Sequence, residues 1–301
     1  MAILVARGTR LLVGGISGRY AQAQVREMLA YGTRIVAGVS PGRGGQTVEG
    51  VPVYDTVAET LPHRPEAAVL YVPAPAVRDA AVEALEAGLK VVVIVAEGVP
   101  AHDAAYIRAV AEDQGAWVVG PNTAGLISPG QCLAGSIAPA YTAPGPIGVL
   151  SRSGTLAFEV ARTLTAAGWG QSTLVDIGGD GITGRSVADY LRAFAEDPET
   201  KAVVLVGEVG GRKEYEAAEV VPSLGLPVIA YVAGRSAPVG RRMGHAGALI
   251  ARVEDSADAK REALRRTGCL VADTIWEIPG LLAQALGGGD PAMRHSAGGR
   301  T

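Results

Sequence analysis

One histidine of the chain stands in a setting that suits phosphoryl transfer. Of the four histidines, His245 alone follows paired arginines in a glycine-rich stretch, Arg241-Arg242-Met243-Gly244-His245-Ala246-Gly247-Ala248. The neutral nitrogen of an imidazole is nucleophilic near pH 7, and small neighbours let a phosphate approach the ring. The other interpretation is a loop histidine that is hydrogen-bonded to the backbone. The loop taken by itself leaves both interpretations open.

A carboxylate elsewhere in the chain could orient such a histidine. Glu208 follows the apolar run 203–206 in the segment Gly207-Glu208-Val209-Gly210-Gly211. The carboxyl ends of strands carry the ligands in open α/β sheets, and a carboxylate there can accept a hydrogen bond from one ring nitrogen. A simpler role for Glu208 is to cap the next helix. Ile177-Gly178-Gly179-Asp180-Gly181 has a similar form, and there Asp180 has the simpler role of fixing a sharp turn.

A cluster of hydroxyls lies between a predicted strand and a predicted helix. Its sequence is Ser151-Arg152-Ser153-Gly154-Thr155. Hydroxyls and unpaired N–H groups at the start of a helix can cradle an anion. A serine hydrolase is disfavoured, because its nucleophile elbow needs glycine two residues before the serine and Ser151 holds that position. The alternative is an ordinary N-cap.

Two segments near the N-terminus indicate a nucleotide. The first predicted strand runs into Gly14-Gly15-Ile16-Ser17-Gly18, a turn that lets a phosphate approach backbone N–H groups, although it is not G-x-G-x-x-G. The second strand ends in Ser40-Pro41-Gly42-Arg43-Gly44-Gly45, with no carboxylate to bond ribose hydroxyls. A guanidinium suits a ribose phosphate, which disfavours NAD and leaves NADP or coenzyme A (CoA). A structural turn and a solvated Arg43 are the alternatives.

The elements that must position these residues alternate between apolar runs and helical stretches. Because the runs are apolar throughout, they predict strands buried on both faces of parallel sheets, and hence an α/β fold. The first series has strands 11–13, 35–39, 68–72, 91–95 and 117–119, with helices 21–31, 75–87 and 102–114. The second has strands 148–150, 174–177, 203–206, 228–232 and 269–271, with helices 155–167, 186–196, 213–221, 256–266 and 274–286. We expect domains at 1–122 and 147–286, a connection with short strands at 123–146, and a flexible tail at 287–301.

Composition excludes several classes of protein. The chain has 301 residues, of which 48% are hydrophobic and 19% charged, so two folded domains are expected rather than disorder. A net charge of −3 gives no bulk attraction to nucleic acid or to an anionic membrane. Two cysteines make neither a disulfide framework nor a Cys-rich zinc site. The N-terminal residues are apolar before they are basic, the reverse of a signal peptide, and the apolar run 91–96 is too short to span a bilayer. We expect a cytoplasmic protein, or one of an organelle matrix.

Taken together, the segments resemble the α subunit of succinyl-CoA synthetase (succinate–CoA ligase) over nearly the whole chain. No one segment is decisive, but their order and spacing are highly specific. They are Ala30-Tyr31-Gly32-Thr33, Gly38-Val39-Ser40-Pro41-Gly42-Arg43-Gly44-Gly45, Tyr71-Val72-Pro73-Ala74-Pro75, Glu97-Gly98-Val99-Pro100, Gly120-Pro121-Asn122, Ser151-Arg152-Ser153-Gly154-Thr155-Leu156, Ile177-Gly178-Gly179-Asp180, Gly207-Glu208-Val209-Gly210-Gly211 and Arg242-Met243-Gly244-His245-Ala246-Gly247-Ala248.

The resemblance implies an N-terminal Rossmann-like CoA-binding domain and a flavodoxin-like ligase domain. It also implies a partner, an ATP-grasp β subunit in an αβ or α2β2 assembly, which would hold Mg²⁺ and ATP or GTP; no metal is expected on this chain. In the family the nucleotide phosphorylates the loop histidine, which passes the phosphoryl group to a dicarboxylate. The thiol of CoA then attacks the acyl phosphate.

The family's functional residues map onto matching positions of this chain. His245 would be the phosphoryl carrier and Glu208 its orienting carboxylate. The cradle for the phosphoryl group and the acid would consist of Ser153, Gly154, Thr155 and Phe158. The residues that would line CoA are Ser17, Gly18, Arg19, Tyr20, Arg43, Val95, Ala96 and Glu97.

The chain departs from the usual family pattern at several positions. Ala21 replaces a glycine, Arg43 a lysine, Thr123-Ala124 a Cys-Pro pair, Phe158 a tyrosine and Gly181 a proline. Most of these changes fall near the expected carboxylate pocket, so malate or citrate stands as an alternative to succinate. Two other classes also stand: a catalytically silent CoA-binding protein, and an NADP-dependent oxidoreductase, which leaves the His245 loop unexplained.

Overall fold

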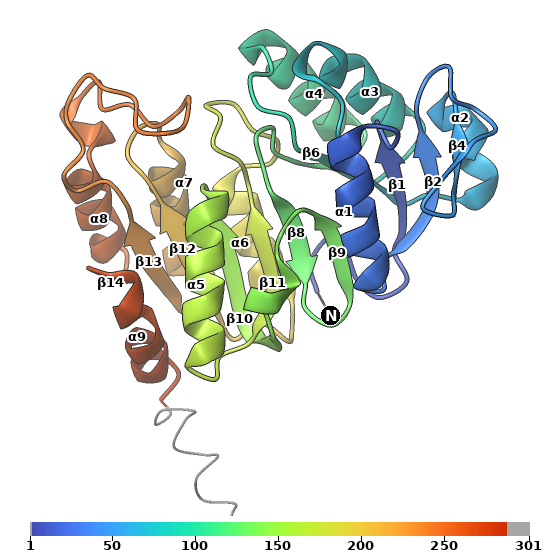
Figure 1. The fold of residues 1–301 in the computed structure, drawn as a ribbon. Coiled ribbons are helices and arrows are strands. Elements are labelled where there is room, and N and C mark those ends of the chain that lie inside the picture. The colour runs from blue at the N-terminus through green and yellow to red at the C-terminus, as the bar shows by residue number, and fades with distance from the viewer. Residues whose placement is uncertain (1, 288–301) are drawn as a thin grey trace, which may run out of the picture. The chain divides into compact units, whose positions relative to one another are not determined.

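The computed structural model describes residues 2–287, so most of the tail expected at 287–301 lies outside the described residues. The chain divides into two compact units (Figure 1). The N-terminal unit holds residues 4–139 and 175–185, and the C-terminal unit holds residues 2–3, 140–174 and 186–287. The domain boundaries expected from the sequence stay a prediction.

The sheet of the N-terminal unit contains seven strands in the order β3-β4-β2-β1-β5-β6-β7. Its pairs are parallel except β3 with β4, which is antiparallel. Every residue of β5 and β6 is buried, as expected for strands covered on both faces. The strands are β1 (Arg10–Gly14), β2 (Arg34–Val39), β3 (Thr47–Val48), β4 (Val51–Tyr54), β5 (Ala67–Leu70), β6 (Val91–Ile94) and β7 (Trp117–Val119).

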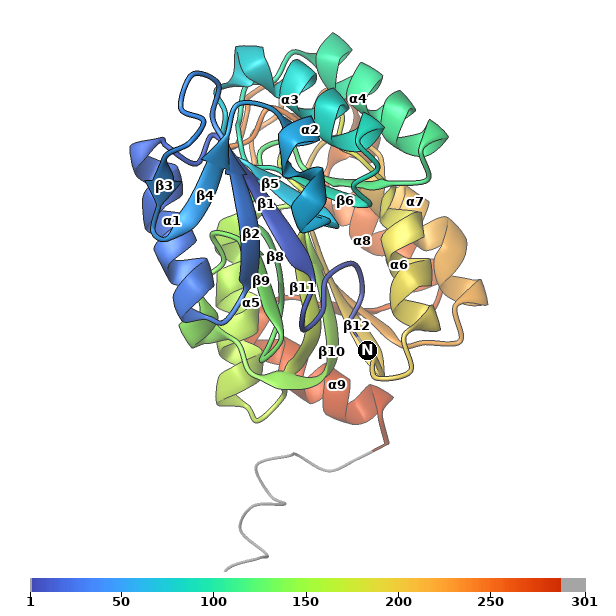
Figure 2. The same ribbon diagram turned by 90° about the vertical axis from the view of Figure 1, so that its right-hand side faces the viewer.

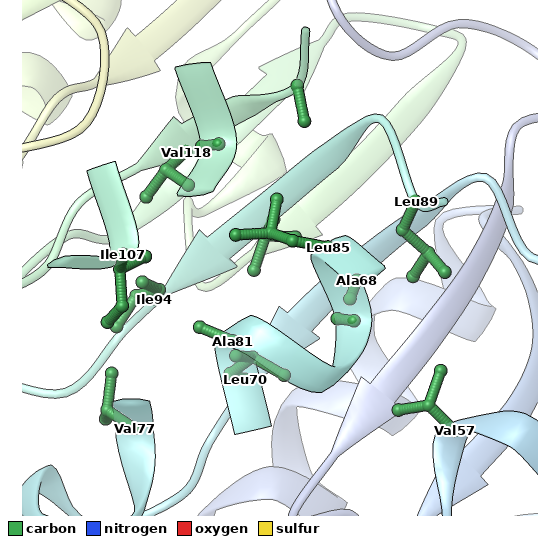
Figure 3. Packing of buried hydrophobic residues seen from close by; sticks show 14 of the residues in the cluster. Val57, Ala68, Leu70, Val77, Ala81, Leu85, Leu89, Ile94, Ile107 and Val118 are labelled. Carbon is green, nitrogen blue, oxygen red and sulfur yellow. The ribbon is translucent and has the colours of Figure 1, made fainter. Parts of the chain in front are cut away.

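The helices of this unit are α1 (Arg19–Ala30), α2 (Val57–Thr60), α3 (Ala74–Glu86) and α4 (Ala101–Asp113), with a 3-10 turn at Leu61–His63. Helices α3 and α4 lie side by side against the sheet (Figure 2). Figure 3 shows their Leu85 and Ile107 packed with Leu70 of β5 and Ile94 of β6. This packed face fixes the strand ends that carry the N-terminal candidate residues.

The second sheet has the order β14-β13-β12-β10-β11-β8-β9. The pairs β10–β12, β12–β13 and β13–β14 are parallel, and β8 with β9 forms an antiparallel hairpin. The expected α/β class is therefore confirmed, although each sheet also contains an antiparallel pair. The strands are β8 (Gly125–Ser128), β9 (Cys132–Gly135), β10 (Pro144–Ser151), β11 (Gln171–Asp176), β12 (Ala202–Gly207), β13 (Val228–Val232) and β14 (Leu270–Ala272).

Side-chain caps set the starts of three helices that follow these strands. The hydroxyls of Ser153, Ser186 and Ser256 each accept a hydrogen bond from a backbone N–H in the first turn, and Ser186 forms a capping box with Asp189. The helices are α5 (Gly154–Ala166), α6 (Val187–Glu196), α7 (Lys213–Val220), α8 (Ala257–Arg266) and α9 (Ile278–Ala285), with 3-10 turns at Pro139–Tyr141, Val221–Ser223, Val253–Asp255 and Ile275–Glu277. Within residues 2–287, no helix combines the length and the apolarity that crossing a membrane requires.

Candidate functional site

His245 and Glu208 meet in the C-terminal unit. The Nδ1 atom of His245 lies 2.9 Å from Oε2 of Glu208, the first residue after β12. The carboxylate is nearly buried, with 8% of its side chain exposed, whereas 26% of the imidazole is exposed. An ionised carboxylate only accepts, so it selects the tautomer with hydrogen on Nδ1 and leaves the lone pair of the neutral ring on Nε2.

The loop that carries His245 is a narrow reversal of the chain. The N–H of Met243 donates to the carbonyl of Ala248 at 2.9 Å, and the N–H of Ala248 donates to the carbonyl of His245 at 3.1 Å. Arg242 and Leu249 form an antiparallel bridge just outside this turn. The backbone of the loop therefore presents the imidazole at a tip of small residues, as the sequence suggested.

The loop lies directly against the turn that follows Glu208. Gly210 has a φ of +81°, and a Cβ atom added there would lie 2.2 Å from the carbonyl oxygen of Gly247 and 2.7 Å from the nitrogen of Leu249. Only glycine allows two backbones to approach this closely in that conformation. The position of the 208–210 turn therefore determines where the histidine loop can lie.

A cluster of buried charges surrounds the same turn. Arg152 lies 3.3 Å from Glu208 and 2.8 Å from Glu214, and Lys260 also contacts Glu214. Burial alone would raise the pKa of Glu214, but Arg152 and Lys260 outweigh burial and hold that pKa below its usual value. Burial lowers the pKa of Lys260, and burial followed by the charge of Arg152 lowers the pKa of Lys213 to about 8. Sequence reasoning missed Glu214 and Lys260, which look like ordinary helix charges.

The serine segment lies at the start of α5. Ser153 acts as the N-cap, since its Oγ accepts from the N–H of Leu156, and Oγ of Ser151 donates to the carbonyl of Ser153 at 2.8 Å. Gly154 and Thr155 are the first helical residues, whose N–H groups have no acceptor within the helix. The cap is one of the two roles expected for Ser153, and the same geometry leaves a helix start available to an anion. Arg152 joins this segment to Glu208.

Phe158 lies one turn further along α5. Its ring centroid is 6.5 Å from that of Tyr141, which precedes β10 and is 42% exposed. The contact packs Phe158 against the ring of Tyr141. Phe158 itself carries no group that can form a hydrogen bond. Tyr141 was not expected from the sequence, because nothing in its surroundings marks it.

The N-terminal unit has a crevice where the strand order reverses. From β1 the chain proceeds to β2 on one side, and β5 pairs on the other side of β1. Ligands of open α/β sheets bind at such a switch point, outside the carboxyl ends of the strands. A cavity of about 230 Å³ lies there. Its lining is mostly apolar and includes Gly14, Gly15, Pro41, Val72 and Asp79. Sequence reasoning did not single out Asp79.

Several residues expected to contact CoA surround the start of α1. Gly18 is its N-cap, and Arg19 and Tyr20 are its first residues. Ser17 is hydrogen-bonded through its hydroxyl to that of Ser40, 2.7 Å away, which joins the loops after β1 and β2.

Tyr20 also contacts the aromatic residue that directly follows β5. Its ring stacks edge-on with Tyr71 at a centroid distance of 5.7 Å. The hydroxyl of Tyr71 is buried and has no hydrogen-bond partner within the described chain, so a polar ligand atom would satisfy it.

Asp55 holds the loop that carries Arg43. Its carboxylate accepts from the backbone N–H groups of Arg43 at 3.0 Å and Gly44 at 2.9 Å. A Cβ at Gly44 would lie 2.7 Å from this carboxylate, so glycine permits the contact. Asp55 was missed by sequence reasoning; the signal available was an acid directly after the apolar segment of β4.

The segment Val95, Ala96 and Glu97 follows β6 and is tied to a neighbouring loop. The N–H of Asn122 donates to the carbonyl of Ala96 at 2.8 Å, and the side-chain amide of Asn122 donates to Asp180 at 3.0 Å. The carboxylate of Asp180 thus holds the side chain of Asn122. The structure brings together the pairs His245–Glu208 and Ser17–Ser40, and it places the phosphoryl and CoA sets in separate units.

Two family models match the chain and define its class. Residues 7–98 match the CoA binding domain, and residues 150–270 match the CoA-ligase model. The chain is thus built as a CoA-binding domain followed by a domain of the CoA ligases.

Close relatives narrow the class to one family. The chain is 47% identical over 287 residues to subunit alpha 2 of the ADP-forming succinate–CoA ligase of Archaeoglobus fulgidus, covering 95% of this chain and 100% of the relative. It is 45% identical over 278 residues to the malate–CoA ligase subunit alpha of Methylorubrum extorquens, covering 90% and 94%. The chain belongs to the family of succinate–CoA ligase α subunits, which confirms the resemblance drawn from the sequence.

A solved structure supports the fold at a greater distance. The ATP citrate lyase of Methanosaeta concilii, a D541A mutant in complex with (3S)-citryl-CoA, superposes with a TM-score of 0.87 at 24% identity. The match covers 95% of this chain, which spans 50% of the length of the lyase chain. This likeness shows that the two-unit architecture also occurs within a longer chain.

Proposed function

We propose that this chain is the α subunit of a succinate–CoA ligase that works through phosphohistidine at His245. The observation that carries the proposal is the 2.9 Å contact between Nδ1 of His245 and the buried carboxylate of Glu208. A CoA-binding protein without catalysis has no need of a partly exposed imidazole held in this way. Membership in the ligase family supports the same conclusion.

The reaction follows from the chemistry of the two residues. Nε2 of His245 attacks the γ-phosphorus of the nucleoside triphosphate, the nitrogen–phosphorus bond forms, and the bond to the diphosphate breaks. Glu208 stabilises the positive charge that develops on the ring, because its carboxylate accepts the Nδ1 hydrogen. The phosphoryl group then passes from Nε2 to an oxygen of the acid. The sulfur of CoA attacks the resulting acyl phosphate and releases phosphate.

The start of α5 is the proposed receiving site for the phosphoryl group. Ser153 caps the helix, and Gly154 and Thr155 supply its first N–H groups. The N-terminal end of a helix stabilises a nearby anion by roughly 0.3–2 kcal/mol. Phe158, further along the same helix, would contact the acid through its apolar ring.

The crevice of the N-terminal unit is the proposed site of CoA. It fits that ligand in three respects: an apolar cavity of about 230 Å³, the unpartnered hydroxyl of Tyr71, and a tight turn at Gly15 with a φ of +72°. Arg43 would pair with the ribose 3′-phosphate. Asp55 holds the loop of Arg43 by accepting from the backbone N–H groups of Arg43 and Gly44. The rest of the CoA nucleotide would be lined by Ser17, Gly18, Arg19, Tyr20 and Val95–Glu97.

The proposal includes a partner and a location. A β subunit of the ATP-grasp type would bind ATP or GTP with Mg²⁺, in an αβ or α2β2 assembly, because the family relatives are named as α subunits. The expected cytoplasmic or matrix location belongs to the same proposal. Without its partner, the chain should turn over little or nothing.

Succinate is the proposed acid, with malate or citrate as the alternatives. The relative from Archaeoglobus is named for succinate and the one from Methylorubrum for malate, at nearly equal identity. The departures at Phe158 and Thr123 remove a hydroxyl and a thiol that the family pattern usually has. The experiment is to measure CoA-ester formation by the co-purified pair on succinate, malate and citrate. Succinyl-CoA as the dominant product supports the proposal, and dominant malyl-CoA or citryl-CoA contradicts the assignment of succinate.

A second experiment separates the ligase from the other classes. With labelled nucleoside triphosphate, the complex should acquire an alkali-stable phosphoryl group that His245→Ala abolishes. His102→Ala is the matched control, since that imidazole is exposed and distant in sequence from the site. Thermal shift with CoA and with NADP tests the ligand: stabilisation by CoA is expected, and stabilisation by NADP alone would indicate the oxidoreductase.

A further inference from the structure

Lys260 is a fully buried lysine on α8, with 0% of its side chain exposed. Its ammonium donates to the carbonyl of Glu208 at 2.8 Å, to the carbonyl of Gly210, and to the carboxylate of Glu214. An ammonium has three hydrogens, and three acceptors surround it. Two of these acceptors are backbone atoms of the turn that carries the candidate orienting carboxylate.

Arg152 binds the same turn with its guanidinium. Its Nη1 donates to the carbonyl of Gly210 at 2.9 Å, to that of Glu208 at 3.3 Å, and to Glu214 at 2.8 Å. Two buried cations therefore share two backbone carbonyls and one carboxylate. Charges buried this deeply are costly unless they are paired, and here Arg152 and Lys260 balance Glu208 and Glu214.

The histidine loop packs against the 208–210 turn that Lys260 and Arg152 hold. Gly210 approaches Gly247 and Leu249 so closely that a Cβ atom would not fit, and its N–H donates to the carbonyl of Asp255 at 2.8 Å. A shift of the turn would move the Glu208 carboxylate and the backbone under His245 together. The cations act on the imidazole through this turn.

We infer that Lys260 is a positioning residue for phosphoryl transfer, which fixes the 208–210 turn and through it the relation of Glu208 to His245. Glu214 accepts from the ammonium and from the backbone N–H of Glu208 at 3.1 Å, and Arg152 completes the clamp. The inference rests on the proposed function, because it assigns a role in the reaction of His245.

The chain offers a matched control on the same helix. Arg261 is also buried, and it donates to the carbonyl of Ala272 at 2.8 Å and contacts Asp273. It therefore holds a backbone carbonyl and a carboxylate as Lys260 does, but at the end of β14 rather than under the histidine loop. A purely structural role for buried cations predicts similar consequences at both positions.

The experiment compares Lys260→Met with Arg261→Met, each purified with its partner subunit and assayed below its unfolding temperature. Misplacement of reacting groups by about 1 Å lowers rates by up to ~100-fold. We expect Lys260→Met to slow alkali-stable labelling of His245 by about 10–100-fold with little change in the KM for nucleotide, and Arg261→Met to label within about threefold of the parent. Equal labelling rates in the two variants would overturn the inference.

A second variant keeps the test decisive if Lys260→Met does not fold. Lys260→Met combined with Glu214→Met removes one charge of each sign and leaves Arg152 paired with Glu208. The turn then lacks both the ammonium and the Glu214 acceptor for the N–H of Glu208, so labelling should stay slow; full recovery of the parent rate would contradict positioning by Lys260. His245→Ala run in parallel separates the two proposals, because label that survives this change refutes the phosphohistidine proposal itself.

Discussion

The contact between the 208–210 turn and the histidine loop can be tested with two neighbouring glycines. Gly210 and Gly211 have φ angles of +81° and +66°, so alanine at either position adopts a left-handed conformation at a cost of roughly 1–2 kcal/mol. Their surroundings differ. A Cβ at Gly210 would lie 2.2 Å from the carbonyl oxygen of Gly247, whereas the nearest neighbour of a Cβ at Gly211 is a side-chain nitrogen of Arg152 at 3.8 Å.

The expected size of the effect follows from these distances. Ordinary van der Waals contact begins near 3.4 Å, so Gly210→Ala requires two backbone segments to separate by roughly 1 Å. Such a displacement of a reacting group lowers its rate by about 100-fold, equivalent to ~2.7 kcal/mol of transition-state stabilisation. Gly211→Ala carries the conformational cost without the displacement. Both variants should lose stability, and only Gly210→Ala should lose phosphoryl transfer.

The assay is the single-turnover rate of alkali-stable labelling in each complex, measured below the unfolding temperatures of both variants. Thermal unfolding of each complex gives the stability loss separately from the rate. If Gly210→Ala labels His245 within about threefold of Gly211→Ala, the turn does not position the loop and the reasoning is refuted.

Three further outcomes are expected. Glu208→Gln keeps an acceptor but loses a charge-assisted hydrogen bond of about 1.5–3 kcal/mol, so labelling should slow by about 10–100-fold; an unchanged rate counts against orientation by the carboxylate. Asp55→Ala frees the loop of Arg43 and should raise the Kd for CoA by about tenfold in calorimetry, and an unchanged Kd would remove Asp55 from the site. Burial raises the pKa of Cys132 and Cys269 to about 11, so the native state holds these protons more firmly than the unfolded chain and stability should fall as pH rises from about 9 to 11. Denaturant titrations across that range check the sign, and stability that rises instead contradicts it.

Much of the fold follows from the sequence because parallel strands are buried on both faces. The apolar runs at 91–95 and 203–206 correspond to β6 and β12, whose residues are all buried. The pair β3–β4 was not anticipated, since β3 has two residues and carries no periodic signal. Hairpins this short depend on the turn and on the neighbouring strand rather than on hydrophobic pattern.

The candidate site was only partly predictable. His245 and Glu208 stand out because each is a chemically active residue among glycines, and the structure brings them into contact. Lys260 and Glu214 do not stand out, because each lies on a helix where charged residues usually face solvent. They are 46 residues apart in the chain, and the sequence alone carries no sign of so distant a pair.

The most direct test of the account is to identify the phosphorylated residue in the working complex. The co-purified subunits are mixed with nucleoside triphosphate, quenched in alkali during turnover, and digested for mass spectrometry of the peptide that contains His245. A phosphoryl group on His245 that forms and disappears at the rate of turnover is the expected result. Turnover of CoA ester with His245 unmodified throughout would contradict the central claim.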